Sequence, residues 1–321
     1  MKKISILMAV YNPNIPFFIE QLKSLDNQDY GNLELLIIDD CSNGINSETI
    51  TNLIEENVTN FPYVFKRNPK NMGSNKTFEE LTKLANGDYL AYCDQDDIWE
   101  KDKLSVLLEQ INVENAVISY SDLSIIDEQG NKIADSFKSL SKRLQHKHGE
   151  NLFPFFLRMN SITGCTMLVD GKIAKEALPF PTSNVYVHDH WLALFASCKG
   201  KISYINRPLV QYRIHSNNQI GAKVLEGIAS KTDYLEKRVL MEAKKVDHLI
   251  TRDFPKDLQI DINNYHEFIS IRKDYLSNLS LSTLFGMLKQ VRKDPVLIIF
   301  EIILGASGGN LSKFLLNFAK Q

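Results

Sequence analysis

The sequence has few of the features that define several common classes of protein. Its four cysteines are scattered and form no CxxC pair, which argues against a disulfide framework or a zinc site and is typical of reduced thiols in a cytoplasmic protein. The formal net charge of −2 gives no reason to expect nucleic acid or an acidic partner. With 321 residues, of which 44% are hydrophobic and 24% charged, the chain is expected to be globular and to form one or two domains.

Glycine-rich phosphate-binding loops are missing where two enzyme classes would need them. A dehydrogenase would carry GxGxxG after its first strand, and a nucleotidyltransferase a glycine-rich loop with arginine, but AVYNPN has no glycine. A phosphatase with an aspartyl nucleophile would have Thr or Val where this chain has Ile98. The basic and then apolar N-terminus lacks a small-residue cleavage site, so we interpret it as a first strand rather than as a secretion signal.

The first half of the chain alternates between apolar runs and segments with helical periodicity. The apolar runs are expected to be strands buried on both faces, and they cover residues 4–10, 33–38, 63–65 and 89–93. The expected helices cover residues 15–25, 47–58, 75–85 and 101–111. This alternation predicts a parallel, doubly wound α/β sheet that gathers the carboxyl ends of its strands along one edge, where ligands bind.

Polar residues follow each of the four expected strands. In chain order they are Tyr11, Asn12 and Pro13, then Asp39 and Asp40, then Arg67 and Asn68, and finally Asp94, Asp96 and Asp97. Any one group can be explained as a cap of the next helix, because Asp and Asn are common caps. The three carboxylates in DQDDIW exceed the need of one cap, and they repel one another unless water, hydrogen bonds or a cation compensate them. An Asp-x-Asp pair suits Mg²⁺ or Mn²⁺, which commonly bridges a protein to a diphosphate.

The second half of the chain is less regular. A strand at 116–120 is expected to lead to a hairpin turn at 129–131, and the segments SITGCTMLVDG and ISYINRPLVQYRIHSNN to contain further strands. VYVHDHWLALFASCKG is apolar on one helical face. The basic segment 138–148 is either a solvated loop or helix, or a contact for a phosphate-bearing acceptor. From about Lys223 onward the chain is expected to be helical.

The far C-terminus is strongly apolar. Its apolar run is interrupted by Glu301 and ends near Gly305, so it is shorter than the roughly 20 residues that span a bilayer. Two interpretations remain open. The segment is a core helix, or it is an interfacial helix pair that rests on a membrane with the help of Lys289, Arg292 and Lys293.

Seven motifs, in this order, resemble those of family 2 glycosyltransferases. They are ISILMAVYNP, LELLIIDDCS, NMGSN, GDYLAYCDQDDIW, ITGCTMLV, HDHW and YRIHSNN, and they extend from about Lys3 to Asn218. The resemblance implies an inverting enzyme with the GT-A fold, a Rossmann-like mixed α/β sheet flanked by helices. The catalytic domain would span residues 1–221, and residues 222–321 would form a helical extension that can associate with a membrane. DQDDIW and HDHW are most similar to the bacterial rhamnosyltransferase-like subgroup.

The resemblance also assigns roles to single residues. Those it places at the nucleotide sugar are Ala9, Tyr11, Asp39, Asp40, Asn71, Asn75, Asp94, Gln95 and Asp97. Asp39 would bind the base, whereas Asp40 has an alternative role in orienting its loop. Asp96 would coordinate Mn²⁺ or Mg²⁺. His215 matches a position that adds a metal ligand in some relatives, although a lone histidine is as often a core or surface residue.

Inversion also needs a base that takes the proton of the attacking acceptor hydroxyl. Asp189 in HDHW is expected at the start of an apolar helix, where the family carries its base; a role as helix N-cap is compatible with this one. Many relatives have Glu-Asp at this point, whereas this chain has His188-Asp189, so the role of the neighbour is not carried over.

The resemblance therefore implies a cytoplasmic enzyme, peripheral on the inner face of the cell membrane if its C-terminus is interfacial. It would transfer a sugar from a nucleoside diphosphate donor to a saccharide acceptor of a cell-surface polysaccharide built on a lipid carrier. dTDP-rhamnose is the expected donor, and a UDP-hexose is the alternative. A different nucleotide-dependent enzyme and a non-catalytic binding module are the remaining alternatives. The presence of Asp94, Asp96 and Asp189 argues against the binding module.

Overall fold

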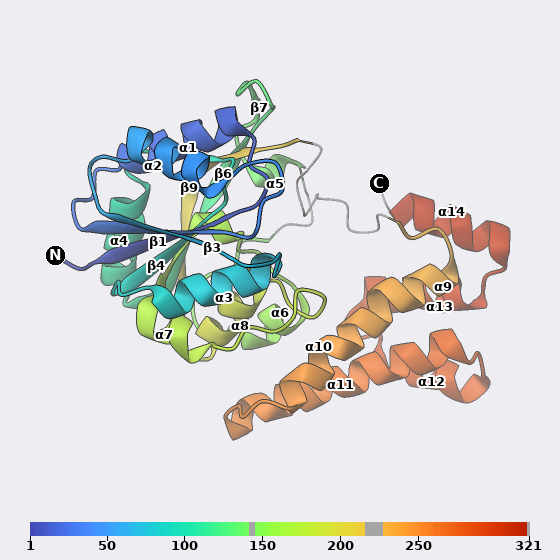
Figure 1. The fold of residues 1–321 in the computed structure, drawn as a ribbon. Helices are drawn as coiled ribbons and strands as arrows, with labels where there is room; N and C mark the ends of the chain where they lie inside the picture. The colour runs from blue at the N-terminus through green and yellow to red at the C-terminus, as the bar shows by residue number, and fades with distance from the viewer. Residues whose placement is uncertain (141–144, 216–226, 320–321) are drawn as a thin grey trace. The chain divides into compact units, whose positions relative to one another are not determined.

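The computed structural model describes residues 1–140, 145–215 and 227–319, and the chain divides into two compact units, Met1–Gln219 and Ile220–Gln321. Figure 1 shows the N-terminal unit as a sheet with helices on both sides and the C-terminal unit as helices. Part of the basic segment expected at 138–148 lies outside the described residues, as do residues 216–218 of YRIHSNN.

The N-terminal unit is built on a nine-stranded sheet in the order β3-β2-β1-β4-β8-β6-β9-β5, with β7 paired to β6. Its strands are β1 (Ile4–Val10), β2 (Leu33–Asp39), β3 (Tyr63–Arg67), β4 (Tyr89–Cys93), β5 (Ile98–Trp99), β6 (Ala116–Ile126), β7 (Lys132–Ala134), β8 (Met167–Asp170) and β9 (Lys201–Arg213). β1 to β4 are parallel, as predicted, whereas β8 runs antiparallel to β4 and β6. The sheet is therefore mixed, as the resemblance to the GT-A fold implies.

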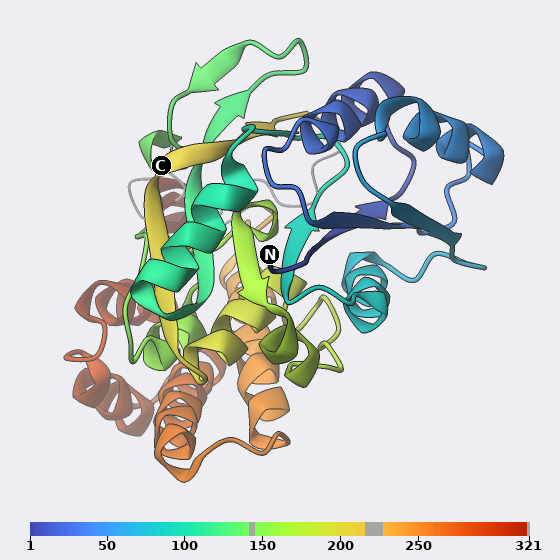
Figure 2. The ribbon, with the colours of Figure 1, turned by 90° about the vertical axis from the view of Figure 1, so that its left-hand side faces the viewer.

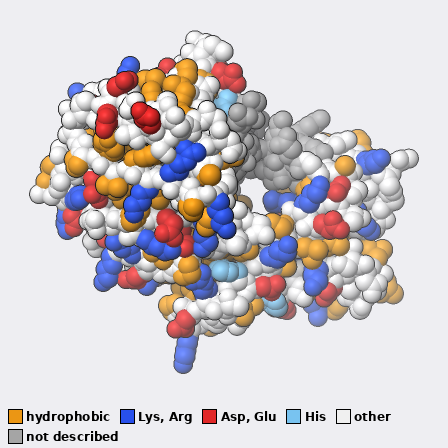
Figure 3. Space-filling model, viewed as in Figure 1, with side chains coloured by type: hydrophobic (Ala, Val, Ile, Leu, Met, Phe, Trp, Pro, Cys, Tyr) orange, Lys and Arg blue, Asp and Glu red, His pale blue; other side chains and the backbone are white. Residues whose placement is uncertain are grey.

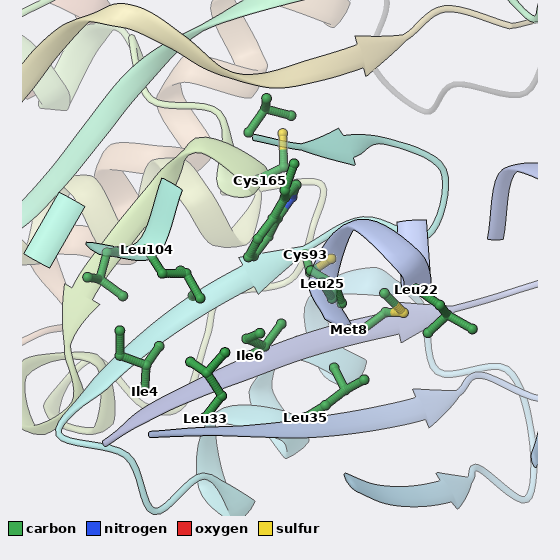
Figure 4. Close-up of a cluster of buried hydrophobic side chains, with 14 of the residues drawn as sticks. Ile4, Ile6, Met8, Leu22, Leu25, Leu33, Leu35, Cys93, Leu104 and Cys165 are labelled. Atoms are coloured by element: carbon green, nitrogen blue, oxygen red, sulfur yellow. The ribbon is translucent and has the colours of Figure 1, made fainter. Parts of the chain in front are cut away.

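Helices cover both faces of the parallel strands. The helices of this unit are α1 (Ile15–Asp26), α2 (Ser47–Asn57), α3 (Ser74–Leu84), α4 (Lys103–Glu114), α5 (Phe137–Leu140), α6 (Phe153–Arg158), α7 (Gly171–Glu176) and α8 (His188–Ser197). α1 and α2 lie on one side of the sheet and α3 on the other (Figure 1), and Figure 2 shows α4 beside β6 and β9. In Figure 4, Ile4, Ile6 and Met8 of β1 lie in one buried cluster with Leu22 and Leu25 of α1. Both faces of β1 are therefore buried, as its apolar sequence predicts.

Two local features test the sequence expectations. The turn predicted at 129–131 joins β6 to β7, and Gly130 adopts a positive φ of 81° that glycine tolerates without strain, so the hairpin is confirmed. β3 lies at the edge of the sheet, and its residues alternate between half-buried and exposed, with Val64 48% exposed. The prediction that this strand is buried on both faces is therefore wrong, because an edge strand is covered less than a central one.

The C-terminal unit consists of helices in the part that the structure describes. They are α9 (Lys231–Tyr234), a π-helical turn (Leu235–Val239), α10 (Leu240–Ile250), α11 (Lys256–Ser277), α12 (Leu281–Gln290), α13 (Pro295–Ala306) and α14 (Gly309–Ala319). Glu301 of α13 is fully buried and accepts hydrogen bonds from Arg272 of α11 at 2.8 and 2.7 Å and from the Tyr234 hydroxyl at 2.8 Å. Arg272 also pairs with Glu242 of α10. One face of α13 therefore belongs to the core of this unit. Within the described ranges no helix combines the length and the apolar content required to cross a bilayer.

Candidate active site

One side chain joins the loops that follow β1 and β4. Gln95 accepts a hydrogen bond from the backbone N–H of Tyr11 at 2.8 Å and donates one from Nε2 to the backbone oxygen of Tyr11 at 3.1 Å. The Tyr11 side chain is exposed, and Ala9, near the end of β1, is half-buried. Two of the strand ends that the sequence places along one edge are therefore in direct contact.

Asp39, the last residue of β2, is fully buried beside a cation. It forms an ion pair with Arg67 of β3 at 3.1 Å and accepts hydrogen bonds from the hydroxyl and the backbone N–H of Ser42. Arg67 in turn donates to the backbone oxygen atoms of Ser42 and Ile45. A surface depression of about 450 Å³ lies at this point, lined by Arg67 and residues 42–47. Asp39 thus holds two of the residues that line this depression, Ser42 and Arg67.

The neighbouring Asp40 supports a loop. Its carboxylate accepts hydrogen bonds from Nδ2 of Asn68 at 2.7 Å and from the backbone N–H groups of Met72 and Gly73, each at 2.8 Å. Asn71, in the same loop, is exposed, and its side chain accepts a hydrogen bond from the backbone of Gly73. These contacts favour the orienting role for Asp40, since its oxygen atoms are occupied by the protein.

Asn75 connects α3 to the start of α8. Its Nδ2 donates to the backbone oxygen atoms of Pro181 at 2.9 Å and Tyr186 at 2.6 Å, and its Oδ1 accepts from the backbone N–H of His188 at 2.9 Å. The residue is 4% exposed. Both amide hydrogens are therefore used within the protein, and the side chain fixes the backbone from which α8 begins.

Asp94, Asp96 and Asp97 form a carboxylate cluster after β4. Asp97 is fully buried, and carboxylate oxygens of Asp94 and Asp97 and the sulfur of Cys165 all lie within 4.8 Å of one another. Burial and the charge of Asp96 raise the pKa of Asp94 to about 7, and the same two causes raise the pKa of Asp97 well above its usual value. Oδ1 of Asp97 accepts from the backbone N–H of Arg213 at 3.2 Å, whereas Oδ2 has no hydrogen-bond partner within the described ranges. The cluster thus holds more negative charge than the protein compensates.

Lys103 provides a cation beside this cluster. It is fully buried at the start of α4, donates from Nζ to the backbone oxygen of Cys165 at 2.6 Å, and lies over the ring of Trp99. Burial lowers its pKa to about 7, although Asp97 and Asp94 oppose that shift. Sequence reasoning did not identify Lys103, because a lysine in an expected amphipathic helix is usually a solvated one.

Asp96 meets His215, 119 residues further along the chain. Nε2 of His215 lies 2.8 Å from Oδ2 of Asp96, and the imidazole packs on Phe17 of α1 with ring centroids 5.7 Å apart. Both side chains are largely buried, at 17% and 12% exposure. Carboxylate oxygens are preferred ligands of Mg²⁺ and Mn²⁺, and neutral imidazole is a common metal ligand. The next residue, Asp97, has an oxygen without a hydrogen-bond partner among the described residues. The residues present therefore fit a divalent cation.

Arg213, at the end of β9, holds the two sides of this pair together. Its Nε donates to the backbone oxygen of Asp96 at 3.0 Å, and its Nη1 to the backbone oxygen of Asp127 at 3.2 Å. It also pairs with Glu20 of α1 and lies 4.4 Å above the ring of Phe17. Arg213 belongs to the YRIHSNN motif, and this is the only feature of the sequence that indicates a role for it. The sequence analysis assigned a role only to the histidine of that motif.

Asp189 lies in the first turn of α8 and is 9% exposed. Val187, rather than Asp189, occupies the N-cap position, so the alternative that Asp189 is the N-cap is wrong. Its carboxylate accepts hydrogen bonds from Nδ2 of Asn160 and from the backbone N–H of Gly164, both at 3.2 Å. These donors come from the segment that leads into β8, and they fix the orientation of the carboxylate.

The residue next to Asp189, His188, is tightly packed and uncharged. His188 packs on Phe78, with ring centroids 4.1 Å apart, and burial lowers its pKa to about 3, so its imidazole is neutral. A Cβ atom at Gly164 would lie 2.7 Å from Nε2 of His188, so only glycine fits there. The charge of Asp189 contributes to the raised pKa of Asp94. Asp189 and the carboxylate cluster therefore belong to one site.

A mixed sheet of this topology, with acidic residues gathered at the ends of its strands, is the architecture that the resemblance to glycosyltransferases with the GT-A fold implies. The chain belongs to glycosyl transferase family 2, whose model matches residues 5–172. The recognition made from the seven motifs is thereby confirmed.

Among curated proteins, the dTDP-rhamnosyl transferase RfbG of Shigella flexneri is 29% identical over 313 residues, which cover 92% of this chain and 99% of RfbG. Among solved structures, Staphylococcus aureus TarS 1–349 in complex with UDP-GlcNAc is similar with a TM-score of 0.57 and 16% identity, over 92% of this chain and 82% of that one. The longer TarS chain is covered over 49% of its length. The mannosyltransferase PcManGT of Pyrobaculum calidifontis, with GDP-Man and Mn²⁺, has a TM-score of 0.56 and 12% identity, over 99% and 84% of the chains.

Proposed function

We propose that the enzyme transfers rhamnose from dTDP-rhamnose, with inversion, to a saccharide acceptor of a lipid-linked cell-surface polysaccharide. The observation that carries the catalytic part of this proposal is the meeting of Asp96 and His215, with Asp189 close enough to raise the pKa of Asp94. The choice of rhamnose is supported by the similarity to RfbG along nearly its whole length. Residues 1–221 would supply the chemistry, and 222–321 a helical extension.

The nucleotide would bind across the ends of β1, β2 and β4. Asp39 would accept a hydrogen bond from the base beside the depression that Arg67 borders, and Ala9 and Tyr11 would line the same pocket. The two hydrogen bonds between Gln95 and Tyr11 would hold together the two loops, after β1 and β4, that border this pocket. Asn71 is exposed and free to approach the ribose, whereas Asp40 and Asn75 would act by holding backbone.

Asp96 and His215 would hold Mn²⁺ or Mg²⁺, which when bound supplies charge neutralisation for the diphosphate leaving group. Asp94 would bind the ribose or the sugar, and Asp97, held from one side by the backbone of Arg213, would keep the loop in place next to the donor. The cation of Lys103 would limit the repulsion within the cluster while the site is empty of substrate.

Asp189 would act as the general base. The hydrogen bonds from Asn160 and Gly164 leave its carboxylate oriented, and the neutral His188 offers no competing proton at neutral pH. The carboxylate would accept the proton of the acceptor hydroxyl as the oxygen attacks the anomeric carbon and the bond to the diphosphate breaks. Because attack comes from the side opposite the leaving group, the configuration inverts.

A panel of donors tests the proposal. Thermal stabilisation with Mn²⁺ and dTDP-rhamnose, UDP-glucose, UDP-GlcNAc or GDP-mannose reports binding, and the released nucleotide reports chemistry. The proposal expects dTDP-rhamnose to stabilise most and to release dTDP. A preference for UDP-GlcNAc, the donor bound by TarS, would favour the alternative UDP-hexose donor. Release of inorganic phosphate or pyrophosphate from the donor would exclude sugar transfer.

A further inference from the structure

The last three helices each expose a stripe of large apolar side chains. The stripes are Leu281, Phe285 and Leu288 on α12, Val296, Ile299 and Ile303 on α13, and Leu311, Phe314 and Phe318 on α14, with exposures from 45% at Ile303 to 87% at Leu281. Within each stripe the residues are three or four positions apart, so they share one side of their helix. α13 contacts both α12 and α14. We call these nine residues the apolar stripes.

The stripes are not the core of the unit. Each helix buries other residues on its inner side, among them Met287 of α12, Ile298 and Leu304 of α13, and Leu316 of α14. The charged centre of that core is complete, because Arg272 and Glu301 are paired with each other. The exposed apolar surface is therefore additional to what holds this unit together, and large exposed patches of this type mark interaction sites.

On the three helices that carry the apolar stripes, the exposed charged side chains are all positive. Between residues 281 and 319, all described, the exposed charged side chains are Lys289, Arg292, Lys293 and Lys313. The two acidic residues in that range are engaged: Asp294 caps α13 by accepting from the backbone of Leu297, and Glu301 is buried. Nζ of Lys289 lies 4.7 Å from the ring centroid of Phe285, so basic and apolar groups are contiguous. Figure 3 shows blue and orange side chains interspersed over this unit in the view drawn.

We propose that the apolar stripes and the four basic residues dock the enzyme on an anionic lipid surface, with α12 to α14 lying in the interface rather than crossing it. Anionic headgroups match the uniform positive charge, and the acyl region takes the apolar side chains. A second copy of the chain fits less well. A two-fold contact through this surface would bring the same basic residues of both copies, Lys289, Arg292 and Lys293, into one interface, and like charges repel.

Flotation of the full-length enzyme with vesicles tests this proposal. Vesicles of phosphatidylcholine with phosphatidylglycerol should bind it, vesicles of phosphatidylcholine alone should bind it much more weakly, and salt should reduce the difference. Phe285→Glu combined with Phe314→Glu should weaken binding by about tenfold or more, because two apolar side chains that would enter the lipid are replaced by charged ones that stay in water. Lys289→Gln with Arg292→Gln should weaken binding to the anionic vesicles by about 25-fold and leave the weak binding to neutral vesicles unchanged.

The control variants keep the same chemistry at other exposed positions. Ile260→Glu on α11, where Ile260 is 62% exposed, and Val113→Glu on α4, where Val113 is 75% exposed, should bind vesicles as the unmodified enzyme does. Circular dichroism and donor hydrolysis should be the same for all variants, because none of these residues lies in the site at the ends of the strands. The proposal is overturned if the unmodified enzyme does not float with anionic vesicles, or if the stripe variants float equally well. Loss of a dimer in light scattering, without loss of vesicle binding, would assign the stripes to a second copy.

Discussion

The two units of the molecule bury charge in opposite ways. In the C-terminal unit Arg272 lies between Glu301 and Glu242, and a tyrosine hydroxyl completes the bonding of Glu301. In the N-terminal unit the carboxylate cluster brings three acidic groups to one loop, with Lys103 as a buried cation. One oxygen of Asp97 has no hydrogen-bond partner among the residues that the structure describes. One arrangement is balanced within the protein, and the other is not.

The difference indicates what each arrangement is for. A buried charge without compensation destabilises the fold, so it is retained where a ligand supplies what is missing. A balanced pair needs no ligand and can serve structure alone. The comparison predicts that substitutions in the carboxylate cluster remove activity and spare stability, whereas substitutions in the Arg272–Glu301 pair do the reverse.

The largest effect is expected at Asp96. Asp96→Asn should reduce sugar transfer to background and abolish the stabilisation by Mn²⁺ and nucleoside diphosphate, because the substitution removes the anionic ligand that faces His215. Removal of divalent cations with a chelator should have the same effect on the unmodified enzyme. Asp135→Asn, in a side chain that is 90% exposed, is the matched control and should change nothing. Full turnover in the chelated enzyme would contradict the inference that the carboxylate cluster needs a cation for activity.

Asp189→Asn comes next. An asparagine can occupy the same space and keep one of the two hydrogen bonds, because its amide has a single acceptor oxygen where Asn160 and Gly164 donate to two. It cannot take a proton, so kcat should fall by roughly 10²–10⁴-fold. The donor KM and the melting temperature should stay close to those of the unmodified enzyme. Steady-state kinetics with dTDP-rhamnose measure both constants. A KM effect with unchanged kcat would remove Asp189 from the role of base.

The structural end of the comparison is tested by Arg272→Met. This change leaves the fully buried Glu301 without its cation, and the free energy of unfolding should fall by about 3–5 kcal/mol. Lys273→Met, at the exposed position next to Arg272 on α11, is the control and should stay within about 0.5 kcal/mol. Urea unfolding measures both. Intact stability in Arg272→Met would show that the pair is not needed by the fold.

Glu79 allows a test by pH inside the N-terminal unit. Burial opposes its ionisation, but hydrogen bonds from Lys83, Lys76 and the backbone of Phe180 outweigh burial and lower its pKa below 4.5. Its contribution is therefore complete above the unfolded pKa and is lost as the pH falls through the folded pKa. At pH 7, Glu79→Gln should cost about 1–2 kcal/mol, and the cost should shrink toward pH 3. Glu80→Gln, one residue further and half-exposed, is the control and should change the free energy of unfolding at pH 7 by less than about 0.5 kcal/mol.

The smallest and most discriminating effect is expected at Asp97. Asp97→Asn replaces a buried carboxyl whose ionisation is disfavoured by burial and by Asp96, and the enzyme should become more stable by about 1 kcal/mol while its turnover falls. Thermal unfolding and donor turnover, measured on the same sample, separate the two effects. A loss of both stability and turnover would show that Asp97 stabilises the fold, as the Arg272–Glu301 pair is expected to do in the C-terminal unit.

Much of this framework is predictable from the sequence because it depends on local pattern. The apolar runs and helix signals gave β1 and β4 with their observed bounds, and three carboxylates in four positions marked the site. The partners of those carboxylates were not predictable. Lys103 reaches Cys165 over 62 positions, and Arg213 reaches Asp96 over 117, and only the packed fold decides such contacts.

Asn75 shows that a residue expected at the ligand from the sequence can instead bond the protein backbone. Its position in the sequence, as the last residue of NMGSN, suggested contact with the nucleotide, and in the structure its amide bonds the backbone ahead of α8, over 100 positions away. Edge effects are equally invisible: nothing in YVF distinguishes β3 from a central strand. The chemistry of a site can thus be read from residue types more readily than the supports that hold it.

The pairing of Gln95 with Tyr11 has a consequence for the loops that follow β1 and β4. A side-chain amide presents one donor and one acceptor, the same two groups that a peptide unit offers, so Gln95 continues the pairing of β1 with β4 beyond the last backbone rung. A glutamate there could accept but not donate. Gln95→Glu would therefore keep one of the two hydrogen bonds that join these loops and lose the other.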